Sequence, residues 1–147
     1  MLEIRRAQVG EIAFLRGLDT IAVVGTERHG LIAMWVTSGV CRTAVLDGEI
    51  AGYSVSSYSF FHQRFIELVL VAKIYRRQGI GLALLRDALE RPTKEKVWTS
   101  TNASNAPMRA MLAKAGFIES GRIDNLDPGD PELIFVHLPA DPLSQAP

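Results

Sequence analysis

The chain has 147 residues, of which 48% are hydrophobic and 22% charged, and its 16 basic residues balance its 16 acidic ones. This composition is typical of a soluble globular protein, and the length suits a single domain, which we expect over residues 1–138. A formal net charge of zero gives no reason to expect nucleic acid or an anionic membrane as a partner.

Membrane insertion and secretion are not expected either. No apolar run approaches the ~20 residues that span a bilayer, and residues 1–12 lack the apolar centre of a signal peptide. The one cysteine, Cys41, cannot form an internal disulfide, which is consistent with a reducing compartment. We therefore expect a cytoplasmic protein, with a flexible, proline-rich tail at residues 139–147.

The first part of the chain predicts a strand, two helices and a hairpin. A strand is expected at residues 2–7, a helix at 9–19, a second short helix at 31–36, and paired strands at 40–46 and 49–59. The dipeptide Asp47-Gly48 between these strands is a strong signal for a tight turn. A second turn near residues 61–64 leads into the next strand.

Residues 66–91 predict a strand, a glycine-bearing loop and a helix. Ile66 to Val71 is an apolar run rich in β-branched residues, as in a central strand covered on both faces. Leu82, Leu85 and Leu89 recur at helical spacing, and Pro92 ends this helix.

The loop between them, Arg76-Arg77-Gln78-Gly79-Ile80-Gly81, has the features of an anion site. Its glycines allow a ligand to approach the backbone closely. The unpaired N–H groups of the following helix favour an anion, and the arginines offer forked donors for phosphate oxygens. The alternative is a turn with two solvated arginines, but the position between a buried strand and an amphipathic helix favours a pyrophosphate cradle.

The last third predicts a strand, a helix and two further strands. A strand at residues 96–100 precedes a run of cap-forming residues that ends in Pro107, which is tolerated only in the first turn of a helix. Met108, Met111, Leu112 and Ala115 form the apolar face of that helix, and Gly116 is expected to stop it. Strands at 117–123 and 133–138 flank an acidic loop. This order of elements predicts a mixed α/β sheet.

At this point the chain resembles the GNAT superfamily of acyl-coenzyme A-dependent N-acetyltransferases. The motif Arg76-x-x-Gly79-x-Gly81 is similar to the pyrophosphate loop of that family. Asn105, followed by the ending Lys114-Ala115-Gly116-Phe117, is similar to its asparagine-containing helix. The order of elements agrees from residue 2 to residue 138, and the two motifs at this spacing form a specific signal together.

The resemblance implies a GNAT-like fold with a central mixed sheet of six to seven strands, flanked by about four helices. It implies acetyl-CoA as co-substrate and no metal. The backbone of one strand would pair with the pantetheine arm, the loop would hold the pyrophosphate, and Asn105 would hydrogen-bond the pantetheine, although N-capping explains this asparagine equally well. The implied cofactor-binding residues are Val69, Leu70, Val71, Arg76, Arg77, Gln78, Gly79, Ile80, Gly81 and Asn105.

Two features bear on catalysis. Glu67 is the one ionisable residue among residues 65–71 and resembles the acidic residue that many members place on this strand. Partial burial would suit it as the general base, and the alternative is a residue at the solvated start of the strand. Leu112 stands where many members have a tyrosine that protonates the departing thiolate, and Met108 where alanine is usual.

The remaining candidates have weaker support. The histidines (His29, His62, His137) are too scattered to predict a metal site. Cys41 is expected to be buried packing. The tyrosines (Tyr53, Tyr58, Tyr75) are expected in the core or at its rim, although any one of them is a possible substitute acid. The acids of the last loop (Asp124, Asp127, Asp130, Glu132) favour a solvated turn over a rim that attracts a cation. By analogy with the family, the acceptor pocket is expected beside Trp35, Phe60, Phe61 and His62.

The function predicted is acetyl transfer from acetyl-CoA to a primary amine by direct attack in a ternary complex. The acceptor is an amine-bearing small molecule, or a peptide or protein, and a homodimer is possible. The absence of the tyrosine makes a non-catalytic acyl-CoA-binding or sensing module the alternative. A dinucleotide-binding oxidoreductase must accommodate Leu84 at a position reserved for glycine or alanine, and a Walker phosphate loop is excluded because its motif is absent.

Overall fold

The computed structural model describes residues 1–18, 26–90 and 95–139. The predictions for Asp19, for the helix stop at Pro92 and for the tail beyond residue 139 fall outside these residues. Within them, the strands are β1 (Leu2–Arg6), β2 (Cys41–Leu46), β3 (Glu49–Phe60), β4 (Gln63–Val71), β5 (Val97–Asn102), β6 (Ile118–Ile123) and β7 (Glu132–His137). The α-helices are α1 (Ile12–Leu18), α3 (Thr26–Thr37), α4 (Ile80–Leu89) and α5 (Ala106–Lys114).

The strands form one seven-stranded sheet in the order β1-β2-β3-β4-β5-β7-β6. The sheet is mixed, because β4 runs parallel to β5 whereas β5 and β6 both run antiparallel to β7. The predicted mixed sheet of six to seven strands with about four helices is therefore confirmed. None of the helices in the described ranges combines the length and the apolar character needed to cross a membrane.

The chain divides into two compact units, and β3 and β4 contribute residues to both. The first unit contains Met1–Ser56 and Leu68–Asp87, and the second contains Ser57–Glu67 and the chain from Ala88 onward. Each unit has its own packing and is described separately.

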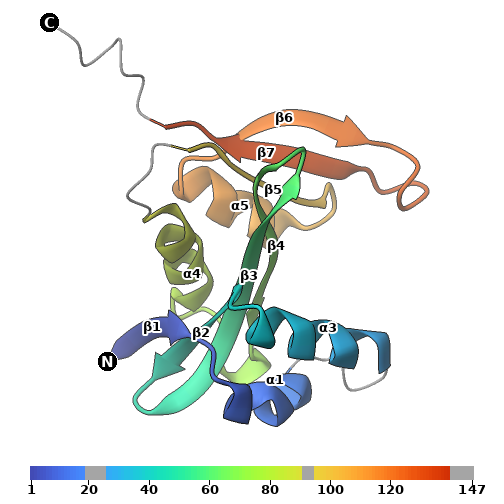
Figure 1. The fold of residues 1–147 in the computed structure, drawn as a ribbon. Helices are drawn as coiled ribbons and strands as arrows, with labels where there is room; N and C mark the ends of the chain where they lie inside the picture. The colour runs from blue at the N-terminus through green and yellow to red at the C-terminus, as the bar shows by residue number, and fades with distance from the viewer. Residues whose placement is uncertain (19–25, 91–94, 140–147) are drawn as a thin grey trace, which may run out of the picture. The chain divides into compact units, whose positions relative to one another are not determined.

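In the first unit, helices cover both faces of the sheet (Figure 1). On one face, Leu15 of α1 and Ile32 of α3 pack in a cluster with Tyr53, against which Leu68 and Leu70 of β4 also pack. On the other face, residues of α4 pack against Ala44, Ala51, Val69 and Val71. Because alternate residues of a strand point to opposite faces, the apolar run of β4 serves both clusters. The prediction of a strand covered on both faces is confirmed.

Two local features complete the first unit. Asp47 and Gly48 have φ angles of 50° and 86°, the positive values that a two-residue turn between hairpin strands requires, so this predicted turn is confirmed. Arg42 of β2 binds Asp87 of α4 through two hydrogen bonds of 2.6 and 3.0 Å. This bidentate pair holds α4 against the sheet.

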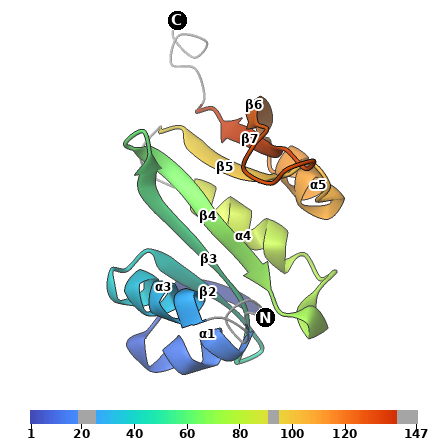
Figure 2. The same cartoon turned by 90° about the vertical axis from the view of Figure 1, so that its right-hand side faces the viewer.

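In the second unit, α5 lies beside the strands β5, β7 and β6 (Figure 2). Six residue pairs align β5 with β7, from Val97–His137 to Asn102–Glu132. Helix α5 begins at Ala106, with Pro107 in its first turn as predicted. Gly116 follows the helix with a φ of 92°, as its predicted role as a stop requires.

A buried arginine anchors the β3–β4 hairpin in the second unit. The side chain of Arg64 is 10% exposed and binds Glu95 at 2.7 Å. Tyr58 donates a hydrogen bond of 2.8 Å to the same carboxylate and accepts one of 3.1 Å from Arg64. No sequence pattern predicted this arrangement, because its partners lie 31 to 37 residues apart.

Candidate active site

The strand segment expected to bind pantetheine uses its side chains for packing. Val69, Leu70 and Val71 are half-buried in the two clusters of the first unit. Ala72, the next residue, donates a backbone hydrogen bond of 2.8 Å to Ala51 of β3. The segment therefore has its backbone, rather than its side chains, to offer a ligand, and it does so along the edge that β3 does not occupy.

The loop from Arg76 to Gly81 leads into α4 and leaves backbone amides unpaired at the start of that helix. Arg77 and Gly79 have φ angles of 66° and 79°, and the carbonyl of Gly79 accepts the first hydrogen bond of α4, from Ala83, at 3.0 Å. The amides of Ile80, Gly81 and Leu82 therefore stand in the first turn, where helical N–H groups have no intrahelical partner. No acidic residue lies in that turn to compete with an anion.

The two arginines of the loop differ in whether their hydrogen-bond donors are already used within the protein. Arg76 donates its Nε to the carbonyl of Val71 at 3.2 Å, which fixes the side chain beside β4 and leaves the terminal guanidinium nitrogens as donors. Arg77 and Gln78 are exposed. The charge and the donors of the loop thus fit a pyrophosphate, as the sequence predicts.

Asn105 is the N-cap of α5 in the structure. Its side-chain oxygen accepts a hydrogen bond of 3.2 Å from the backbone N–H of Met108. The capping alternative is therefore confirmed. Capping uses only the oxygen, so the amide nitrogen of Asn105 still has two hydrogens for a ligand.

Leu112 is completely buried on α5 and has no polar atom to donate a proton. Each of the three tyrosines is either buried in the core or hydrogen-bonded to a glutamate. Tyr53 is completely buried in the core of the first unit, and Tyr58 binds Glu95. Tyr75 donates to Glu49, and this hydrogen bond raises the pKa of the Tyr75 hydroxyl above its ordinary value. Each is a poorer acid candidate than the sequence alone suggests.

Glu67 is exposed, so the expected partial burial of this carboxylate is wrong. At its position near the end of the second unit's part of β4, two hydroxyls of β3 hold it. Ser57 Oγ donates to one carboxylate oxygen at 3.3 Å and Ser59 Oγ to the other at 3.3 Å. The Oγ atoms of the two serines are 3.1 Å apart. The side chain is thus accessible yet oriented, which sequence reasoning missed because the serines lie eight and ten residues upstream.

The acidic loop between β6 and β7 is tied to the segment before α5. Asp127 accepts a hydrogen bond of 2.9 Å from Asn102, and Asp130 accepts two from Ser104, at 2.6 and 3.0 Å. Glu132 accepts one of 2.7 Å from Ser100, and Asp124 pairs with Arg122 at 2.8 Å. These contacts give the acids structural partners and hold the loop in place, as the predicted turn requires.

Trp35 was expected at the acceptor pocket and is instead a core residue. It is 8% exposed and packs in the cluster of the first unit that contains Leu15 and Cys41. Burial, reinforced by the charge of Glu11, raises the pKa of the Cys41 thiol to about 12, which agrees with a packing role. In the part of the chain that the structure describes, no three or more histidine, cysteine, aspartate or glutamate residues gather as a metal site.

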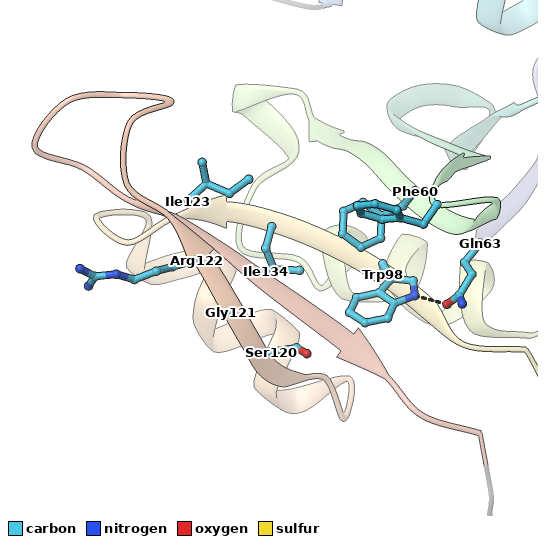
Figure 3. Close-up of a pocket in the computed structure, with 9 residues that line it drawn as sticks. Phe60, Gln63, Trp98, Ser120, Gly121, Arg122, Ile123 and Ile134 are labelled. Carbon is cyan, nitrogen blue, oxygen red and sulfur yellow. Dashed lines mark hydrogen bonds between the residues drawn. The ribbon is translucent and has the colours of Figure 1, made fainter.

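A pocket of about 550 Å³ lies in the second unit, on the face of the sheet turned away from α5 (Figure 3). Phe60 and Trp98 project into it, and Trp98 donates its Nε1 to Gln63 at 2.6 Å. The described lining residues are Phe60, Phe61, Gln63, Trp98, Ser120, Gly121, Arg122, Ile123 and Ile134. Phe60 and Phe61 were predicted to line an acceptor pocket. His62 is not among the lining residues, and the sequence did not single out Trp98.

The chain is similar to known acetyltransferases in sequence and in fold. Residues 11–117 match the family model described as acetyltransferase (GNAT) family. A GNAT-family acetyltransferase from Bacillus cereus ATCC 10987 has a solved structure that is 31% identical, with a TM-score of 0.87 over 96% of this chain and 99% of that chain.

Two further similarities are partial. A streptothricin acetyltransferase from Streptomyces lavendulae is 34% identical over 79 residues, which are 51% of this chain and 42% of the relative. A protein from Bacillus anthracis str. Ames, assigned as a streptothricin acetyltransferase and solved in complex with acetyl coenzyme A, is 23% identical. It has a TM-score of 0.59 over 69% of this chain and 62% of its own, a likeness of fold.

Proposed function

Because the chain belongs to the GNAT acetyltransferase family, we propose that it transfers the acetyl group of acetyl-CoA to a primary amine by direct attack in a ternary complex. The observation that carries the proposal is the Arg76–Gly81 loop. It joins a strand with an available backbone edge to the free amides of α4, and it contains two cations and no acid. That donor set suits the pyrophosphate of coenzyme A.

In this proposal each region has one task. The backbone of Val69, Leu70 and Val71 pairs with the pantetheine amides, as an added strand does. The N–H groups from Arg77 to Gly81, with the Arg76 guanidinium, hold the pyrophosphate. The amide nitrogen of Asn105 donates to the pantetheine while its oxygen caps α5.

Glu67 acts as the general base. An alkylammonium with a pKa of about 10 is protonated at neutral pH and must lose a proton before it can attack. The Glu67 carboxylate, oriented by Ser57 and Ser59, takes this proton directly or through water. The neutral nitrogen then attacks the thioester carbonyl, and the C–S bond breaks as the amide C–N bond forms. The nitrogen loses its second proton in this step, and because Leu112 has no proton to give, water carries that proton to the departing thiolate.

Two measurements, of thermal stability and of thiol release, test the proposal. Acetyl-CoA should raise the melting temperature more than NAD or ATP, and free thiol should appear when the protein, acetyl-CoA and a diverse panel of primary amines are combined. Stabilisation by NAD alone would rule the proposal out. Stabilisation by acetyl-CoA with no thiol release from any amine would favour the alternative, a non-catalytic acyl-CoA-binding module, which the buried Leu112 supports.

Two variants separate the two proposed roles of Asn105, which are to donate to the pantetheine and to cap α5. Asn105→Ser keeps a side-chain oxygen for the cap and loses the amide donor, whereas Asn105→Ala loses both. We expect the KM for acetyl-CoA to rise roughly five- to tenfold in each, the effect of one hydrogen bond. Only Asn105→Ala should lose stability, by about 1 kcal/mol in the free energy of unfolding. An unchanged KM in Asn105→Ser would show that the residue serves α5 alone.

The proposal also covers the setting of the reaction. We place it in the cytoplasm, where a reducing environment suits the unpaired Cys41 thiol. The acceptor is a small molecule or a peptide or protein amine, without nucleic acid or membrane as a partner. The possible homodimer is tested by sedimentation of the purified chain.

A further inference from the structure

We infer that the pocket lined by Phe60, Phe61 and Trp98 binds an uncharged apolar group of the acceptor, so that the preferred acceptor is a primary amine with an aromatic ring on a short linker. This inference extends the proposed function and rests on it, because only that function makes the bound molecule an acetyl acceptor. The pocket itself, and the class of group that fits it, follow from the second unit alone.

The aromatic wall of the pocket has no charged side chain beside it among the described lining residues. Among the described lining residues Arg122 is the ionisable one, and it pairs with Asp124 at 2.8 Å. Figure 3 shows its side chain directed away from Phe60 and Trp98. The indole N–H of Trp98, the one donor of that side chain, is already used by Gln63. A charged group placed against Phe60 and Trp98 would lose hydration without a counter-ion beside it, so the group that fits this wall is uncharged.

The aromatic walls are held in place before a ligand arrives. Phe60 is stacked on Phe65 with ring centroids 5.3 Å apart, and its ring lies 5.1 Å from that of Trp98 and 4.9 Å from that of Phe61. Aromatic rings at these spacings attract one another, and a further ring adds to such a cluster in the same way. Because the walls are preorganised, little conformational entropy is lost when an aromatic group binds.

The tight turn that carries Phe61 exposes an apolar ring. Phe61 and His62 have φ angles of 50° and 64°, which residues other than glycine rarely adopt, and Phe61 is 83% exposed. These are the angles that a two-residue turn between hairpin strands requires. The turn leaves the ring of Phe61 exposed on the lining of the pocket, where a ligand would cover it.

Strand β4 links the aromatic wall of the pocket to the candidate base. Phe65, which supports the Phe60 wall, precedes Glu67 by two residues, so their side chains leave the strand on the same side about 7 Å apart. An amine joined to a ring by a short alkyl linker spans that separation. The ring then lies against the aromatic wall while the nitrogen reaches the carboxylate.

Tryptophan fluorescence tests binding without any need for turnover. The chain has two tryptophans, and Trp35 is buried in the first unit, so the Trp35→Phe variant reports on Trp98 alone. Titration with phenethylamine should give a saturable change in that variant, and ethanolamine should give none. The Trp98→Phe variant should show no change with either amine. An equal response to both amines, or no saturable response to phenethylamine, would overturn the inference.

The KM values of two amines provide the second test of the inference. Phe61→Ala should raise the KM for phenethylamine roughly tenfold and leave the KM for ethanolamine unchanged, as expected when one apolar wall is removed. Phe14→Ala is the matched control, because Phe14 is also exposed, at 56%, but lies on α1 in the first unit. Equal effects of Phe61→Ala on both amines would contradict the inference. Saturable fluorescence without thiol release from any amine would overturn the proposed activity and leave the pocket assignment standing.

Discussion

Replacement of Glu67 by glutamine should lower kcat/KM for acetyl transfer by roughly 10²- to 10³-fold at neutral pH, the usual contribution of a general base. Glutamine has nearly the same size and keeps an oxygen that accepts from Ser57 or Ser59, so the fold and the affinity for acetyl-CoA should not change. What disappears is the proton acceptor for the attacking ammonium. Thiol release at saturating acetyl-CoA measures the loss.

The loss of activity in Glu67→Gln should become smaller as the pH rises. As the pH approaches about 10, a growing fraction of the amine is already neutral and needs no base. The ratio of wild-type to Glu67→Gln rates should therefore shrink as the pH rises. Glu119→Gln is the control, because Glu119 is an exposed acid of β6 whose contact, with Arg109, is 3.9 Å long. A pH–rate profile that Glu67→Gln leaves unchanged would exclude Glu67 as the base.

Replacement of Gly52 by alanine should lower the free energy of unfolding by about 3 kcal/mol, at the upper end of what over-packing costs. A Cβ on Gly52 would lie 2.4 Å from the carbonyl oxygen of Leu70 and 3.2 Å from the Cα of Val71. Both obstacles are backbone atoms of β4, which cannot move aside as a side chain tip does. The hydrogen bond from Ala72 to Ala51 restrains the same stretch, so the strands must separate.

The same substitution should also affect the proposed cofactor segment, because Leu70 and Val71 would be displaced. We expect a higher KM for acetyl-CoA together with a lower midpoint in chemical denaturation. Gly30→Ala is the matched control, since Gly30 lies in helix α3 with no atom within 4 Å of the added Cβ. That variant should gain about 0.5–1 kcal/mol from helix propensity. A Gly52→Ala protein as stable as the unmodified one would contradict this account.

Features that depend on neighbours in the chain were predictable from the sequence. The turn at Asp47-Gly48 was one, because its conformation depends on two adjacent residues. Helix α5 was another, because a cap, a proline and a closing glycine delimit it within twelve residues. Most strand and helix positions followed in the same way from apolar periodicity. The second helix was predicted too short, because α3 begins at Thr26 rather than residue 31 and contains Gly30.

Features that depend on contacts between distant segments were not predictable. Trp35 and Phe60 are both aromatic residues, yet one lies in the core and the other in a pocket. Composition and spacing do not distinguish these outcomes, because burial depends on which elements pack over a residue. The same holds for Tyr58, whose partner Glu95 lies 37 residues away.

The sequence by itself determined the elements of a mixed α/β sheet and the Arg76–Gly81 loop, because periodicity, turn residues and a contiguous motif act over a few residues. The tertiary structure alone decided how Glu67 is held. Its serines come from a strand that returns beside it, and their hydroxyls reach the carboxylate only once β3 and β4 are paired. It also decided where Trp98 lies, because the wall that this residue shares with Phe60 joins segments 38 positions apart.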